Sequence, residues 1–177
     1  MIFLPVAGVG YAIEKSDYYR NMLLKAADVL AERFNDKGNF IRAWDTWDWD
    51  TDPAFIEEKK GKAIIDSMMN IPLLFQAAKL TGNNYYYDIG IKHAHTMAEY
   101  IVREDGSTFH TYNFDHKSGM PIAGKTQQGY SDNSCWSRGQ SWAVYGFALA
   151  YKYTKQAKFL TLSEKTAAYF MSHLNAV

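Results

Sequence analysis

The sequence contains a single cysteine, Cys135, among its 177 residues. A disulfide within the chain is therefore excluded, which fits a reducing compartment such as the cytoplasm and leaves a periplasmic location open. Neither sign of charge is in excess, because 19 basic residues balance 19 acidic ones. The charge balance thus provides no global field that would recruit nucleic acid or an anionic membrane, and an anionic ligand requires cations placed locally.

Several kinds of site are also missing. The sequence has no Gly-rich phosphate loop, no nucleophile elbow and no His and Cys cluster with metal-ligand spacing. His93 and His95 are two positions apart on an expected helix, so they point to different sides and cannot share one metal ion. The apolar opening from Met1 to Gly8 lacks a basic region and is too short to cross a bilayer. We interpret it as the end of a buried segment.

What the sequence does contain is helical periodicity. Apolar residues recur at threes and fours from Ser16 to Asp36, which predicts an amphipathic helix. A related pattern returns about 67 residues later, from Asn84 to Gly106, and a fainter third copy includes Phe159 and Phe170. Self-similarity at a fixed period indicates stacked supersecondary units.

Two further predicted helices, Ile64–Leu80 and Ser134–Tyr153, are more apolar all round, which is typical of helices buried on both sides. Alternating amphipathic and buried helices, without a convincing strand pattern, predict an all-α fold of the α/α toroid type. An open arc of such a toroid leaves buried helices exposed at its ends. We therefore expect residues 1–177 to be one partial (α/α)6 domain of about two and a half helical hairpins, with self-association through its exposed edges as a further possibility.

Two long loops, Asn39–Gly61 and Ser107–Asn133, hold many of the aromatic and polar residues. Loops of this length inside a compact domain are usually functional. In the first loop, the Trp-Asp run from Trp44 to Asp50 has two interpretations. It is either a sugar platform, with indole faces against the C–H side of a pyranose ring, or a surface loop anchored by buried Trp side chains.

The segment after the second loop combines a cation with aromatic rings. If a helix begins near Ser134, then Ser134, Arg138 and Trp142 lie one above the other on one face, with Tyr145 further along. That face is suited to an anionic sugar, although an Arg stem covering a surface Trp is an equally good interpretation. Cys135, next to this face, is interpreted as a packed thiol.

Asp66 is the carboxylate of greatest interest, because it lies among Ile and Met residues at the opening of a predicted buried helix. As a helix N-cap it would have a lowered pKa. As an acid enclosed by apolar neighbours it would have a raised pKa, because burial favours the protonated form. The two hypotheses make opposite predictions about its titration.

Three separated motifs carry a resemblance to a known family. They are Asp66–Leu74 (DSMMNIPLL), Gln127–Asp132 (QQGYSD) and Trp136–Trp142 (WSRGQSW). In this order they resemble the unsaturated glucuronyl hydrolases of glycoside hydrolase family 88. The resemblance implies an (α/α)6 barrel, of which the chain covers about the middle half. It also implies removal of a 4,5-unsaturated uronic acid from oligosaccharides released by polysaccharide lyases, with no metal or organic cofactor.

The same resemblance implies roles for individual residues. Asp66 matches the family's acid, which protonates C4 of the substrate's vinyl ether and then acts as base towards water. The positions that match substrate contacts are Gln128, Arg138 and Trp142, together with His110 and Trp44. An Arg suits an anionic ligand and a Trp suits stacking on a sugar.

The chain departs from the family in one respect. A second aspartate, in a His-Asp-x-Gly-Phe segment, is expected just upstream of Met1, and we therefore expect the 177-residue chain alone to have little activity. Two rivals remain. The unsaturated rhamnogalacturonyl hydrolases share fold and mechanism, but are expected to have Asn-Gly where this chain has Gln140-Ser141. A non-catalytic sugar-binding half-barrel is the rival of another class.

Overall fold

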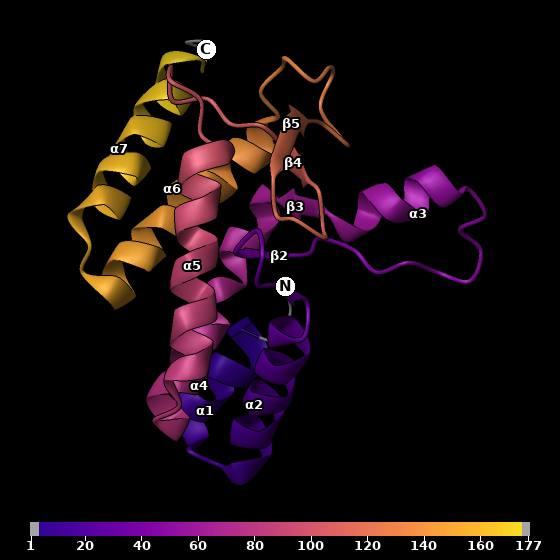
Figure 1. Cartoon of the computed structure of the whole chain (residues 1–177). Coiled ribbons are helices and arrows are strands. Elements are labelled where there is room, and N and C mark those ends of the chain that lie inside the picture. The colour runs from indigo at the N-terminus through magenta and orange to yellow at the C-terminus, as the bar shows by residue number, and fades with distance from the viewer. Residues whose placement is uncertain (1–3, 175–177) are drawn as a thin grey trace.

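The computed structural model describes residues 4–174, and helices dominate it (Figure 1). The five long helices are α2 (Asp17–Ala31), α4 (Ile71–Thr81), α5 (Asn84–Tyr100), α6 (Ser137–Thr154) and α7 (Ala157–Ser172). All five correspond to helices that the periodicity predicts. A π-helical turn (Leu4–Gly8) and the short helices α1 (Val9–Glu14) and α3 (Pro53–Lys60) are additional. No helix in residues 4–174 has the length and apolarity that a membrane span requires.

Local chemistry explains where several helices begin and end. The side chain of Asn83 accepts a hydrogen bond from the backbone N–H of Tyr85 and so caps α5. Asp52 caps α3 in the same way, with Pro53 in its first turn. Helix α4 ends at Gly82, whose φ of 72° is the left-handed conformation that glycine adopts without strain.

The repeat in the sequence is visible in the core. Leu23 and Ala27 of α2 are buried, and so are the residues 67 positions later, Gly90 and Ala94 of α5. Helix α4 packs between these two copies, while α6 and α7 form an adjacent pair (Figure 1). The third copy, α7, buries Phe159 against Phe147 of α6. Each amphipathic helix thus buries one side against a more apolar neighbour.

The prediction of no strands is wrong, because the long loops and the residues next to them form two small antiparallel sheets. One strand includes Phe34, which was assigned to the predicted helix from Ser16 to Asp36, and that helix ends at Ala31. Strands β1 (Phe34–Asn35) and β2 (Phe40–Ile41) make a hairpin. Strands β3 (Lys62–Ile64), β4 (Thr111–Phe114) and β5 (Pro121–Lys125) make a three-stranded sheet in that order. Each strand is two to five residues long. Strands this short show too little alternation to be recognised in a sequence.

The predicted helix Ile64–Leu80 is also wrong in its first part. Its opening residues form the end of β3 and then a 3₁₀ turn, Ile65–Met69, here called the Asp66 turn. The α-helix begins only at Ile71, with Pro72 in its first turn. Because Pro72 has no backbone N–H, it is tolerated in the first turn of a helix but would break the hydrogen bonding of a helix interior, so the α-helix starts here more readily than it continues from upstream.

Candidate active site

The three-stranded sheet brings together residues that are far apart in the sequence. Ile64 of β3 pairs with Thr111 of β4, and Thr111 pairs in turn with Lys125 of β5. These three residues therefore form one row at one end of the sheet. Three predicted site residues lie one to three positions beyond that row: Asp66, His110 and Gln128. The sheet, which the sequence did not predict, assembles this part of the site.

Helix α6 approaches the Asp66 turn closely because glycines face it. A Cβ atom added at Gly146 would lie 2.4 Å from the Cβ of Met68, and one at Gly139 would lie 3.2 Å from Cγ2 of Ile65. The first separation is too short for the side chain of any other residue, and the second would require Ile65 to shift by a few tenths of an ångström. The close packing brings the first turns of α6, with Arg138 and Trp142, to the carboxyl of Asp66.

A buried chain of hydrogen bonds holds the Asp66 turn on its other side. The backbone N–H of Ile41 donates to Nδ1 of His93 over 3.0 Å, so Nε2 of that ring carries the proton. Nε2 then donates to Oγ of Ser67 over 2.6 Å, and Ser67 donates to the carbonyl of Ile64 over 2.5 Å. Complete burial lowers the pKa of His93 to about 3 and keeps the ring neutral.

Asp66 has a raised pKa, chiefly because burial disfavours its charged form. A backbone hydrogen bond, the charge of Arg138 and the indole of Trp142 oppose that shift. The N-cap hypothesis is wrong, because the 3₁₀ turn begins after Ile64 and no side chain caps it. A carboxyl that retains its proton is what an acid catalyst requires.

The ring of His110 is oriented by two backbone groups. The N–H groups of Gln127 and Gln128 both donate to its Nδ1, over 3.0 and 3.1 Å. Nε2 therefore carries the proton, and it lies 3.7 Å from Oδ2 of Asp66. Burial lowers the pKa of His110 to about 4, and the charges of Arg138 and Lys62 act in the same direction. His110 is thus a neutral donor that faces Asp66.

Three buried polar atoms of the site have no hydrogen-bond partner among residues 4–174. They are Oδ2 of Asp66, Nε2 of His110 and Nε1 of Trp142. Buried polar atoms are nearly always paired, and the exceptions are concentrated at functional sites. Two N–H donors and one carboxyl oxygen are therefore available to a ligand beside the Asp66 turn.

Arg138 is placed differently from the prediction. Helix α6 begins at Ser137, so Ser134 lies outside it and forms a separate turn with Ser131. Arg138 and Trp142 remain one helical turn apart, but the guanidinium lies 4.4 Å from the ring centre of Trp136 instead of covering Trp142. Its Nη2 donates to Oε1 of Gln128 over 2.8 Å. The contact joins α6 to the loop that orients His110.

Trp136 is a site residue that sequence reasoning did not single out. Its ring centre is 4.2 Å from that of His110, so one indole contacts both His110 and Arg138. The available signal was its position in the Trp136–Trp142 motif, which has an aromatic residue on either side of the arginine.

Trp44 does not join the other predicted residues around Asp66. It is half-buried in an adjoining cavity of about 220 Å³, together with Trp47, Phe55, Lys59, Lys62 and Gln127. The candidate site therefore has two parts, the group around Asp66 and this cavity, and Gln127 belongs to both.

The remaining sequence interpretations concern groups outside the site. Cys135 is a packed thiol as predicted, and its Sγ donates to Oε1 of Gln140 over 3.1 Å. His93 lies in the core whereas His95 packs on Phe159, so the two rings point apart as predicted. Within residues 4–174, no three His, Cys, Asp or Glu side chains are placed to hold a metal ion.

Comparison with known proteins places this arrangement in a family. The model of Glycosyl Hydrolase Family 88 matches residues 4–177. The chain belongs to glycosyl hydrolase family 88. The resemblance that the three motifs indicate is confirmed.

Relatives of this family 88 chain include an unsaturated chondroitin disaccharide hydrolase of Streptococcus pneumoniae, 40% identical over 173 residues. The crystal structure of the unsaturated glucuronyl hydrolase of Bacillus sp. GL1, described as responsible for glycosaminoglycan degradation, is 36% identical with a TM-score of 0.89. The enzyme of Streptococcus agalactiae, solved as an aspartate-to-asparagine variant complexed with dGlcA-GalNAc6S, is 32% identical with a TM-score of 0.73.

These matches cover most of the chain but less than half of each relative. The S. pneumoniae match covers 98% of the chain and 42% of that protein. The Bacillus structure matches 97% of the chain and 44% of its own, and the S. agalactiae structure 98% and 38%. The solved relatives are α/α barrels, and the chain corresponds to part of one. The predicted fold class is confirmed.

Proposed function

We propose that this protein is an unsaturated glucuronyl hydrolase and that Asp66 is its acid catalyst. The observation that carries the proposal is the half-buried carboxyl of Asp66, whose raised pKa favours the protonated form and which lies next to two N–H donors that have no partner among residues 4–174. Family membership and the names of the relatives support the same activity. Because the chain spans about 42% of the first relative, the activity is proposed for a form that has the relatives' length.

The reaction begins with transfer of the Asp66 proton to C4 of the unsaturated uronic acid. The C4–C5 double bond is consumed, and the positive charge that develops at C5 is shared with the ring oxygen. Asp66, now a carboxylate, accepts a proton from water as that water adds to C5. The resulting hemiketal opens and releases the remaining sugar at C1. A group that serves in turn as acid and base functions best when its pKa is near the working pH, which a raised pKa favours.

The other residues bind and orient the substrate in this proposal. His110, as a neutral Nε2–H donor, and Trp142, through Nε1–H, hydrogen-bond oxygen atoms of the sugar next to Asp66. Arg138, fixed by Gln128 and Trp136, provides positive charge for the substrate's carboxylate. No metal or organic cofactor has a role in these steps.

The substrate class follows from the relatives in this proposal. Their names and titles specify chondroitin disaccharide, glycosaminoglycan and dGlcA-GalNAc6S. We therefore expect an unsaturated uronic acid joined to an amino sugar.

We also propose that the protein is cytoplasmic and that two chains associate through exposed barrel edges. Sedimentation velocity would test that association.

The test is the loss of ultraviolet absorbance from the conjugated double bond of unsaturated chondroitin disaccharide. The 177-residue chain would be compared with a form extended to the length of its relatives, and each with its Asp66→Asn variant. We expect decay with the extended form and at least a hundredfold slower decay with its Asp66→Asn variant. Equal rates for the extended form and that variant would exclude Asp66 as the acid. Absence of decay with every form would overturn the proposed function.

A further inference from the structure

Both long loops carry exposed aromatic side chains. In the first loop, Trp47 and Trp49 are 50% and 73% exposed, so the hypothesis of a loop anchored by buried Trp side chains is wrong for these two residues. In the second loop, Tyr130 is fully exposed. It belongs to residues 126–134, here called the Gln128 loop, every one of which is exposed or half-buried. Because burial does not fix this loop, its position depends on hydrogen bonds.

Hydrogen bonds within the Gln128 loop give it a defined shape. Oδ1 of Asp132 accepts from the backbone N–H of Thr126 over 2.8 Å, and Oγ1 of Thr126 accepts from the N–H of Gly129 over 2.8 Å. Oγ of Ser134 accepts from the N–H of Ser131 over 3.1 Å and donates to its carbonyl over 2.7 Å. These bonds are internal, so they do not determine where the loop lies relative to the rest of the site.

The side chain of Arg103 attaches the Gln128 loop to an earlier part of the chain. Its Nη2 donates to the backbone carbonyls of Asp132 and Ser134 over 3.0 and 3.2 Å. Its Nη1 donates to the hydroxyl of Ser107 and to the carbonyl of Thr108, each over 3.1 Å. One guanidinium thus joins the loop to the turn that follows α5 and leads towards β4.

That turn is itself held in place, so it can serve as an anchor. The backbone N–H of Arg103 donates to the carbonyl of Ser107 over 2.8 Å. Gln140 of α6, which is completely buried, donates to the carbonyl of Gly106 over 2.8 Å and accepts from the hydroxyl of Thr108 over 3.0 Å. The turn is therefore tied to α6, the helix that packs against the Asp66 turn.

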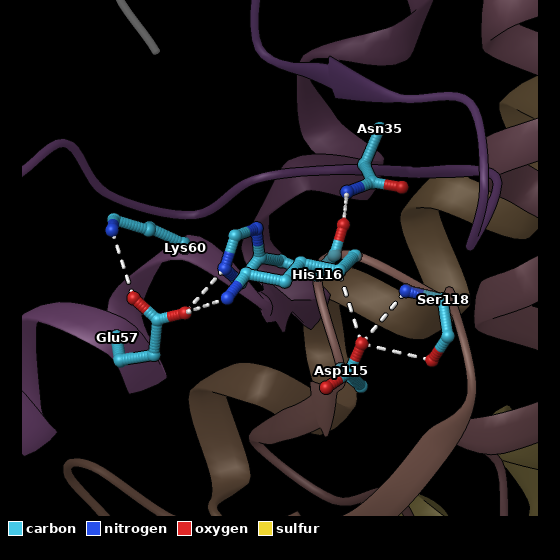
Figure 2. A network of polar contacts seen from close by, with 7 residues as sticks. Asn35, Glu57, Lys60, Asp115, His116 and Ser118 are labelled. Atoms are coloured by element: carbon cyan, nitrogen blue, oxygen red, sulfur yellow. Dashed lines mark hydrogen bonds and ion pairs between the residues drawn. The ribbon is translucent and has the colours of Figure 1, made fainter.

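The first copy of the repeat has a corresponding cross-link at a different place. Asn35, 68 residues before Arg103, lies in the hairpin that follows α2. Its Nδ2 donates to the carbonyl of His116 in the β4–β5 turn over 2.8 Å, as Figure 2 shows. That turn is at the opposite end of the sheet from the row that adjoins the Asp66 turn. Of the two cross-links, the one made by Arg103 is therefore at the candidate active site.

We propose that Arg103 is a positioning residue that holds the Gln128 loop in the place required for substrate binding. The inference rests on the proposed function, in which His110 and Arg138 bind the substrate. The N–H of Gln128 donates to Nδ1 of His110, and its side chain accepts from Arg138, so displacement of the loop would disturb both contacts. An arginine can reach four acceptors in two segments with its fork of donors, whereas a lysine has a single nitrogen.

The first test separates substrate binding from chemistry in the extended form. Arg103→Lys keeps the charge and loses the fork. It should raise KM for unsaturated chondroitin disaccharide roughly tenfold and change kcat less than about threefold, because Ser67 and His93 hold the Asp66 turn independently. A merely structural role would reduce the amount of folded enzyme, and hence the apparent kcat, at constant KM. Initial rates from ultraviolet absorbance measure both, and an unchanged KM would overturn the proposal.

The second test does not depend on activity. Hydrogen exchange of the extended form, followed by mass spectrometry on peptides that cover residues 126–134, should be roughly tenfold faster in Arg103→Lys than in the parent. Asn35→Ala is the matched control, because it removes the corresponding cross-link of the first copy. It should change neither KM nor the exchange of these residues by more than about twofold.

The outcomes separate this proposal from the proposed function. Unchanged exchange in Arg103→Lys, or equal acceleration in Asn35→Ala, would overturn the positioning role and leave the proposed function intact. Faster exchange in Arg103→Lys alone, without turnover by any form, would overturn the proposed function and show that Arg103 still holds the loop.

Discussion

The Asp66 turn and helix α3 both place a carboxyl group near a positive charge, yet the pKa values of the two carboxyl groups change in opposite directions. On α3, direct hydrogen bonds from Lys60 and His116 lower the pKa of Glu57 to about 2 (Figure 2). At the Asp66 turn, burial raises the pKa, and the charge of Arg138 compensates only in part. The side chain of Arg138 is bonded to Gln128 instead. A nearby charge thus lowers a carboxyl pKa strongly when it bonds the carboxylate directly, and an acid site avoids that contact.

The largest expected effect separates these two carboxyl environments by activity. Asp66→Asn should slow turnover by the extended form roughly 10²- to 10⁴-fold, because general acid–base catalysis contributes factors of that size. The matched variant Asp50→Asn, at the carboxylate that pairs with Lys59 of α3, should change disaccharide turnover less than twofold. Initial rates from ultraviolet absorbance provide the measurement. A larger loss with Asp50→Asn than with Asp66→Asn would reverse the comparison.

Asp66→Asn should raise the stability of the fold, although it lowers activity. A raised folded-state pKa means that Asp66 stabilises the fold at low pH and loses this contribution as the pH rises through that pKa. Near neutral pH, Asp66→Asn should therefore stabilise the protein by up to about 1 kcal/mol, after allowance for partial exposure of the carboxyl. Urea unfolding of the 177-residue chain at pH 7 measures this difference. Destabilisation would show that the ionised carboxyl has a partner.

The next effect concerns the support behind the Asp66 turn. His93→Gln should destabilise the chain by roughly 2 to 4 kcal/mol, because it disrupts the buried bonds to Ile41 and Ser67. His95→Gln is the control on the same helix, and with its ring only half-buried against Phe159 it should cost less than about 1 kcal/mol. Similar losses of unfolding free energy in the two variants would argue against this support.

A smaller effect should appear when the pH is lowered. The pKa values of His93 and His110 are about 3 and about 4 in the folded protein, below the ordinary value of 6.5. The unfolded chain therefore binds more protons, and stability should fall by about 2 kcal/mol for each of the two histidines as the pH drops from 7 to 5. Asp66 opposes this trend, because it gains its proton first in the folded state. Urea unfolding at several pH values tests the slope, and His93→Gln should flatten it.

The smallest effect is expected on helix α3. Glu57→Gln removes the ion pairs with Lys60 and His116, which are open to solvent and screened by salt. We expect a change in unfolding midpoint within the error of a urea titration. Disaccharide turnover by the extended form should change less than twofold, since Glu58 still holds α3 to Asn113. A large loss of unfolding free energy would mean that these exposed ion pairs stabilise the fold.

The helices were predictable because their signal is repeated along the chain. The pattern of Leu23 and Ala27 recurs 67 residues later as Gly90 and Ala94, and these positions are buried in both helices. Asp66, Arg138 and Trp142 were predictable for another reason, since each lies in a motif of the family. Neither kind of signal depends on how distant segments pair.

The row of paired residues that assembles the site could not be predicted. Ile64, Thr111 and Lys125 belong to strands too short to show alternation, and only their pairing brings His110 towards Asp66. The start of α6 was missed because several residues around Ser134 resemble helix caps, and Ser134 bonds Ser131 instead. Side-chain bonds of this kind depend on the folded loop and have no separate sequence signal.

The two backbone N–H groups that point at Nδ1 of His110 have a consequence for kinetics. An imidazole held in one tautomer and with a pKa of about 4 stays neutral throughout the neutral range. A pH–rate curve should therefore show no ionisation of His110 in that range. Its alkaline limb should fall with unit slope as Asp66 loses its proton, and the ionisation of His110 should appear only in acid.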